Sequence, residues 1–209
     1  SSTDNLGATV ANPFNLRDER GRSSWDRRHA FVASWLWTPP IKFANRAANT
    51  LLGGWTLTGI HTVQSGAPLT FVMGDDVALD GTFGDQHAQL VPGVTVKDIT
   101  VSHPNRAAMV DRFFNTAAFV PTNDVPRGTY GNAGRGLISG PAMSSTDLSV
   151  LKDFLIREPY RLQFRTEAFN AFNQVNFTDV STQVNSSAFG QIRGADDGRV
   201  LQLALKFIW

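Results

Sequence analysis

The residues that could carry out chemistry are few, and none has a spacing typical of a catalytic or metal site. Ser65 lies in "VQSGAP", which lacks the G-x-S-x-G turn of a hydrolase nucleophile, so Ser65 and Gly66 are interpreted as bend residues. A hydrolase with its site on a long loop is therefore the weakest functional hypothesis. The chain has four histidines, and no two of them have metal-ligand spacing: His29, His61, His87 and His103.

The acidic residues give no stronger signal. Four aspartates lie close together in sequence and offer oxygen atoms that suit Ca²⁺: Asp75, Asp76, Asp80 and Asp85. Their spacing matches no EF-hand loop, so a solvated loop is the favoured interpretation. Glu167 and Arg165 share one strand face, which indicates an ion network rather than the paired carboxylates of a glycosidase. The sequence therefore predicts no catalytic residue, no cofactor and no metal.

The composition excludes several classes of protein. The chain has no cysteine, which rules out disulfide frameworks and thiolate metal sites. The formal net charge of +1 argues against a nucleic-acid partner. No apolar run of about 18 residues is present, so no transmembrane helix is predicted, although the short alternating strands of a barrel would escape such a test. The opening "SSTDNLGATV" has no starting Met and no signal peptide, which indicates a C-terminal piece of a longer chain.

The elements that must position these residues are strands. The last residues alternate strictly between an apolar face and a face of Gln, Ala and Lys, which is the period of a strand. The apolar face of this segment consists of Leu201, Leu203, Leu205, Phe207 and Trp209. Similar alternation predicts five strands, near 30–37, 55–72, 145–156, 160–171 and 199–209. The charged face of 160–171 needs water, either in a lumen or in bulk solvent, because unpaired charges cannot face a dry core.

The connections between these strands are sorted by length. The link over 39–54 and the turn at Pro159 are short, whereas 73–143 and 172–198 are long. In a meander, this order places the short links at one end and the long loops at the other, as in bacterial outer-membrane barrels. The predicted fold is all-β: an antiparallel meander over 1–209 that forms the C-terminal part of a transmembrane β-barrel, with long extracellular loops. A secreted or surface β-sandwich binding module remains the alternative.

Seven stretches of the sequence resemble those of one family. They are "DRRHAFVASWLW", "GGWTLTGIHTVQSGAPLTF", "FFNTAAFV", "GNAGRGLISGP", "TDLSVLKDF", "LQFRTEAFNAFNQVNF" and "FGQIRGADDGRVLQLALKFIW". With these stretches, the sequence is similar to the C-terminal part of TonB-dependent outer-membrane receptors, and more narrowly to the large receptors, common in acidobacteria, that carry a carboxypeptidase-regulatory-like N-terminal domain. They cover most of 26–209, while 1–25 and 73–110 carry little resemblance.

The resemblance implies a function and a set of partners. It implies uptake of a scarce nutrient across the bacterial outer membrane, such as a siderophore or an oligosaccharide. A complete receptor has a plug domain, a segment that contacts TonB and about 22 strands. The partners implied are therefore the rest of the barrel and its plug, the TonB system, outer-membrane lipid and the barrel-assembly machinery, which reads the aromatic end of the last strand.

Three aromatic residues of the first long loop are candidates for ligand contact. Phe113, Phe114 and Phe119 lie in "FFNTAAFV" and have flat rings that suit a sugar or a siderophore. The alternative, which we favour, is that they form a small core of the loop itself. The sequence does not choose between ligands.

Overall fold

The computed structural model describes residues 10–81 and 86–209, and the chain divides into two compact units. The sheet unit consists of His29–Gln64, Met143–Asn176 and Asp196–Trp209. The loop unit consists of the segment up to Arg28 together with Ser65–Ala142 and Phe177–Ala195. The second unit is thus built from the long connections between strands of the first.

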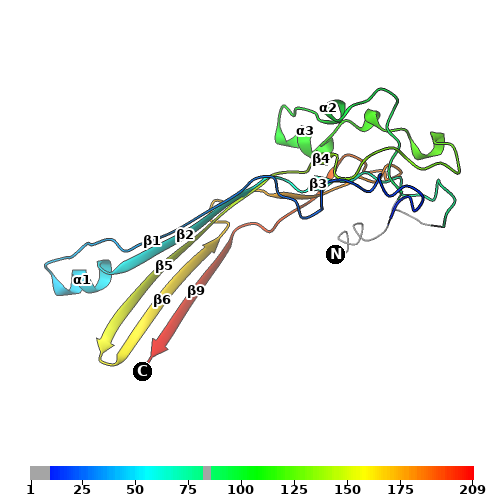
Figure 1. Cartoon of the computed structure of the whole chain (residues 1–209). Coiled ribbons are helices and arrows are strands. Elements are labelled where there is room, and N and C mark those ends of the chain that lie inside the picture. Colours follow the sequence, from blue (N-terminus) through cyan, green and yellow to red (C-terminus); the bar gives the residue numbers. More distant parts are fainter. Residues whose placement is uncertain (1–9, 82–85) are drawn as a thin grey trace. The chain divides into compact units, whose positions relative to one another are not determined.

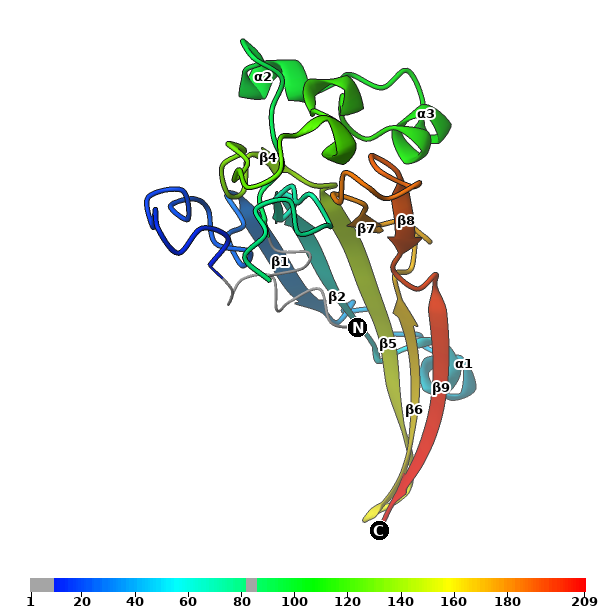
Figure 2. The same ribbon diagram turned by 90° about the vertical axis from the view of Figure 1, so that its right-hand side faces the viewer.

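The sheet unit contains one five-stranded antiparallel sheet of order β1-β2-β5-β6-β9 (Figure 1). Each strand pairs with the next strand of this sheet along the chain, so the predicted all-β meander is confirmed. Figure 2 shows the same sheet from another side, with β1 at one edge and β9 at the other. The strands are β1 (Ala30–Trp37), β2 (Trp55–Gln64), β5 (Met143–Arg157), β6 (Tyr160–Phe169) and β9 (Val200–Ile208).

The predicted strand over 55–72 is wrong at its end. Strand β2 stops at Gln64, and Pro68–Leu69 forms the separate strand β3, which pairs with β4 (Ile138–Ser139) in the loop unit. Between β2 and β3, the chain at Gly66 lies so close to Gly140 that an added Cβ would collide with the Gly140 carbonyl oxygen. Pro68 also has no N–H to donate to a continued ladder.

The corner after β6 depends on Asn170. Its φ of 48° lies in the left-handed region, so β6 ends at Phe169 instead of continuing to 171 as predicted. The Asn170 side chain accepts a hydrogen bond from Gln174 N at 2.9 Å and donates one to Gln174 O at 2.8 Å. Asn170 thereby closes a turn that a strand-forming residue would not adopt.

The short connection between β1 and β2 contains one helix, α1 (Arg46–Leu52). Asn45 caps its start by accepting hydrogen bonds from the backbone N–H groups of Ala47 and Ala48. Gly54, with a φ of 68°, then turns the chain into β2. Strands β5 and β6 are joined by a turn at Glu158 and Pro159.

The predicted long loops have regular structure of their own. Residues 172–198, predicted as a loop, contain a hairpin of β7 (Phe177–Val180) and β8 (Ile192–Ala195). The loop predicted over 73–143 contains β4 and several short helices. These helices are α2 (Val96–Ile99), α3 (Arg106–Asp111), η2 (Thr116–Ala118) and η3 (Thr122–Asp124).

The loop unit has its own hydrophobic core. Phe71 and Phe114 are completely buried and pack edge to face, with ring centroids 4.8 Å apart. Phe119 and Phe189 complete the aromatic cluster. Because Phe189 comes from the second long connection and the other three rings come from the first, this core joins the two connections into one folded body.

Among residues 10–81 and 86–209, no helix has both the length and the apolar character that a membrane-crossing helix needs.

Candidate functional site

The five-stranded sheet has one apolar face and one polar face. Cross-strand partners share a face, so the register assembles each face row by row. One such row of the apolar face joins Leu57, Val150, Thr166 and Leu203. The apolar face also carries Trp35, Trp37, Trp55, Phe154, Leu162, Phe164, Leu201, Leu205 and Phe207.

This apolar face is uncovered. Leu203 is 72% exposed and Leu201 is 66% exposed, and Val200 to Phe207 are all exposed. In a β-sandwich these side chains would be packed under a second sheet. The β-sandwich hypothesis is therefore wrong, and the face needs an apolar environment other than this chain's own core.

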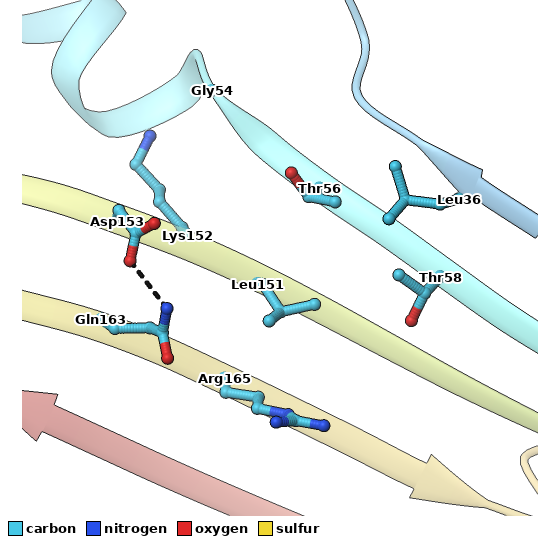
Figure 3. Close-up of a pocket in the computed structure, with 9 residues that line it drawn as sticks. All are labelled: Leu36, Gly54, Thr56, Thr58, Leu151, Lys152, Asp153, Gln163 and Arg165. Carbon is cyan, nitrogen blue, oxygen red and sulfur yellow. Dashed lines mark hydrogen bonds between the residues drawn. The ribbon is translucent and has the colours of Figure 1, made fainter.

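The polar face carries a hollow of about 340 Å³ (Figure 3). Its polar lining comes from β2, β5 and β6, and includes Thr56, Thr58, Asp153, Gln163 and Arg165. Gln163 Nε2 donates to Asp153 Oδ1 at 2.9 Å, across the β5–β6 pair. The hollow therefore offers both hydrogen-bond donors and hydrogen-bond acceptors.

Glu167 and Arg165 form an ion pair on this polar face, in line with their shared strand face in the sequence. Ser149, on the neighbouring strand, donates to Glu167 Oε1 at 3.4 Å. The two groups that contact the Glu167 carboxylate, Arg165 and Ser149, thus both belong to strands of the sheet. An exposed ion pair of this kind adds little stability.

Lys152 lies on the apolar face, and its charge is accommodated there. The residue is only 3% exposed. Its ammonium donates to the carbonyl oxygen of Gly53 and lies 5.2 Å from the ring centroid of Trp55 and 5.1 Å from that of Phe154. The two aromatic rings and the carbonyl group together supply a negative potential that stabilises the ammonium group.

Four of the five residues predicted as the barrel-assembly signal share one face of β9, which is an edge strand of the sheet. Leu201, Leu203, Leu205 and Phe207 alternate along the apolar side of β9. The Phe207 ring stacks on Tyr160 at 5.9 Å and on Trp209 at 6.1 Å. Such a cluster of aromatic rings at one end of the strands is typical of the girdle at a membrane–water interface.

The loop unit contains a cavity of about 530 Å³ with a basic and aromatic lining. Among the described residues that line it, none is acidic. Arg22 is held in place because it donates to Asp26 at 2.8 Å and to Ser139 Oγ at 2.8 Å. The polar and aromatic lining residues are Arg22, Arg28, Thr100, His103, Phe113 and Ser139.

The three candidate loop aromatics divide between core and cavity. Phe114 and Phe119 are buried in the core of the loop unit. Phe113 lines the cavity, where its ring stacks on His103 with centroids 5.9 Å apart. His103 Nε2 donates to the carbonyl of Arg112 at 2.9 Å, which fixes the orientation of the imidazole ring. No sequence pattern separated Phe113 from its neighbour Phe114, because only the packing around them differs.

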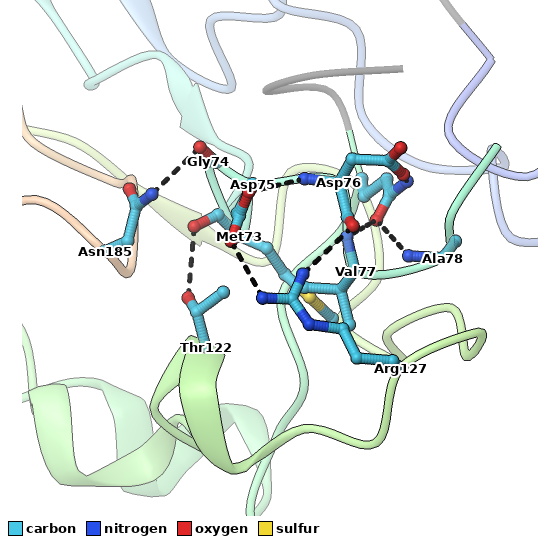
Figure 4. A network of polar contacts seen from close by, with 10 residues as sticks. Met73, Gly74, Asp75, Asp76, Val77, Ala78, Thr122, Arg127 and Asn185 are labelled. Atoms are coloured by element: carbon cyan, nitrogen blue, oxygen red, sulfur yellow. Dashed lines mark hydrogen bonds and ion pairs between the residues drawn. The ribbon is translucent and has the colours of Figure 1, made fainter. Parts of the chain in front are cut away.

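The aspartates of the first long loop are engaged by the protein (Figure 4). Asp76 Oδ1 accepts from Gln86 Nε2 at 2.9 Å, and Asp75 pairs with Arg127 at 3.3 Å. Gln86 is fully buried, and its carbonyl oxygen accepts from the N–H groups of Val77 and Ala78. The carboxylates of Asp75 and Asp76 are therefore occupied by contacts that stabilise this part of the loop. No cluster of three or more potential metal ligands occurs in 10–81 and 86–209, and Asp85 lies outside these described residues.

A second polar cluster joins the N-terminal segment to the loop core. Glu19 accepts from Ala11 N at 2.7 Å and pairs with Arg135 at 3.4 Å. His87 Nε2 lies 3.8 Å from Glu19 Oε1. Burial lowers the pKa of His87 below its usual range, and the nearby Glu19 carboxylate opposes this effect only in part. His87 is therefore a neutral structural residue near neutral pH.

Comparison with protein families agrees with this geometry. Residues 1–202 match the family described as outer membrane beta barrel domain. The chain belongs to this family. The match includes 1–25 and 73–110, where the sequence showed little resemblance to TonB-dependent receptors. Comparison with curated proteins and with solved structures gives no match.

Family membership gives the two faces of the sheet their environments. An outer membrane beta barrel domain is located in the bacterial outer membrane. In such a barrel, the apolar side chains face lipid and the polar side chains face the lumen. The face of Leu203 is therefore the lipid face, and the face of Arg165 is the lumen face.

Proposed function

We propose that this chain is part of a TonB-dependent receptor that takes up a scarce nutrient through the outer membrane. The observation that carries the proposal is that the long connections fold into a unit with its own core and cavity. A barrel that served only as a passive pore would not need a folded body of this kind in its connections. The seven sequence stretches that resemble TonB-dependent receptors support the same function.

The orientation follows from the chain path. The connections that leave Gln64 and Phe169 are long, whereas those that leave Trp37 and Arg157 are short. Because outer-membrane barrels have short periplasmic turns and long extracellular loops, we propose that the loop unit is extracellular. It would then form part of the surface that captures the nutrient.

Within the loop unit, the cavity of Arg22, Arg28, His103 and Phe113 is the proposed capture site. The guanidinium groups suit carboxylate or phosphate oxygens, and the Phe113 ring offers a flat apolar surface to a sugar or siderophore ring. We assign no catalytic role, since the cavity has no nucleophile with an adjacent base and outer membrane barrels are typically not enzymes.

The proposed partners follow from the open edges of the sheet. Among the described residues, β1 pairs only with β2, and β9 pairs only with β6. Unpaired backbone groups are not tolerated in hydrocarbon, and five strands are fewer than the smallest known barrels have. We therefore propose that further strands, a plug domain, the barrel-assembly machinery and the TonB system complete the working protein.

A direct test uses the complete gene product purified from outer membranes. We expect it to bind the periplasmic domain of TonB in a pull-down, and to lose this binding when its TonB-contacting segment is deleted. The control is an outer-membrane porin handled in the same detergent. A complete protein that shows no TonB binding above the porin would overturn the proposal.

A further inference from the structure

The connection between β1 and β2, residues 38–54, has an exposed apolar surface that the sheet does not use. No residue of α1 is buried, and the exposure of large apolar side chains to water is unfavourable. The exposed apolar residues of this connection are Ile41, Phe43, Leu51 and Leu52.

The same connection is basic. It contains Lys42 and Arg46 and has no Asp or Glu between residues 38 and 54. A segment that contains basic and large apolar residues but no acidic residue has the composition of a membrane-surface element. Its charge is complementary to an anionic lipid headgroup rather than to a zwitterionic one.

The connection is anchored to the lipid face of the sheet. The indole N–H of Trp55, on the apolar face, donates to the carbonyl of Leu51 at 3.2 Å. The ammonium of Lys152, on the same face, donates to the carbonyl of Gly53. Both bonds end on backbone groups at the end of α1, so the end of this connection is held beside the lipid face of the sheet.

We propose that residues 38–54 form a binding site for anionic glycerophospholipids of the periplasmic leaflet. The side chains of Phe43, Leu51 and Leu52 enter the acyl boundary, while Lys42 and Arg46 pair with the phosphate groups. The choice of leaflet rests on the orientation in the proposed function. The basic residues give the preference for anionic lipid, and each charge near the membrane surface is expected to raise the affinity about fivefold.

The test is a lipid titration of the complete protein in detergent, followed by native mass spectrometry. Phosphatidylglycerol is expected to bind more tightly than phosphatidylethanolamine, and the double variant Lys42→Gln/Arg46→Gln should lose this preference. Lys206→Gln is the matched control, because it removes a basic residue from the polar face near the same end of the sheet, and it should keep the preference. An unchanged preference in the double variant, or stronger binding of lipopolysaccharide at this site, would overturn the proposal.

A second measurement distinguishes lipid from a protein partner. A photoreactive benzoylphenylalanine at position 43 is expected to give lipid adducts and no discrete protein adduct when cells are irradiated. A discrete protein adduct would overturn the proposal. Neither readout depends on TonB binding or on uptake, so a protein that binds TonB without a lipid preference would refute this inference alone.

Discussion

Single residues decide how charge is tolerated in this chain. Lys152 is a charged side chain on the lipid face of β5, where it interrupts the apolar alternation that the sequence shows. Its ammonium reaches a backbone carbonyl and two aromatic rings instead of hydrocarbon. A long flexible side chain can follow such a path along an apolar surface, and this behaviour explains the interruption.

His87 is the residue through which acid should weaken the loop unit. Its pKa is lowered by burial, so below about pH 6.5 the unfolded chain binds a proton that the folded chain does not. The contribution of neutral His87 to the stability of the loop unit is therefore fully present above about pH 6.5, and it decreases as the pH falls below this value. Hydrogen exchange at the amide of Ala88, which donates to Phe71 O at 2.9 Å, should show faster local opening at pH 5 than at pH 7.5, after correction for intrinsic exchange rates.

The control variant is His87→Gln, which cannot gain a proton in this range. It should reduce the pH dependence of Ala88 protection even if it lowers protection at both pH values. An equal pH dependence in both proteins would show that His87 is not the source of the effect.

At the scale of elements, β9 shows how the register assigns each side chain to lipid or water. Leu203 lies opposite Thr166 on the lipid face, and the adjacent Gln202 lies opposite Glu167 on the lumen face. One step along the strand thus changes the environment completely.

A matched pair of variants tests this assignment. Leu203→Arg places a charge toward lipid and should destabilise the barrel by about 2–4 kcal/mol if the position lies near the bilayer centre. Gln202→Arg places the same charge beside Glu167 in the wet lumen and should be nearly neutral. The free energy of unfolding in lipid vesicles, measured by urea titration of the complete protein, separates the two outcomes. Equal losses would contradict the assignment of faces.

The elements also show what the sequence could predict. Period-two alternation over eight or more residues located β1, β6 and β9, because each has one apolar face that requires this pattern. The division between β2 and β3 could not be predicted in full, since it depends on the approach of Gly140 to Gly66, which are far apart in sequence. Strands β7 and β8 have four residues each, too few to show a period.

The candidate sites could also be predicted from the sequence only where their residues are close together along the chain. The lumen network of Arg165 and Glu167 was predictable because both residues lie on one strand face. The cavity of the loop unit was not, because Arg22, His103 and Ser139 come from three distant segments that only tertiary packing brings together. Likewise, no local pattern placed Phe114 in the core and Phe113 at the cavity.

At the scale of the whole molecule, the uncovered lipid face determines how the chain should behave in solution. Residues 1–209 expressed alone present the apolar face and two unpaired sheet edges to water. We expect this chain to aggregate in buffer and to stay dispersed only in detergent, as measured by sedimentation and light scattering. A monodisperse monomer in detergent-free buffer would contradict the assignment of this face to lipid.

The two long connections interlock within the loop unit. Val72 pairs with Gln183, and Phe113 N donates to the carbonyl of Gly190 at 2.7 Å. Antibodies raised against the native surface should therefore recognise epitopes assembled from both connections, and linear peptides copied from either connection should bind these antibodies poorly. For the same reason, a graft intended to transfer specificity to another barrel would have to move both connections together.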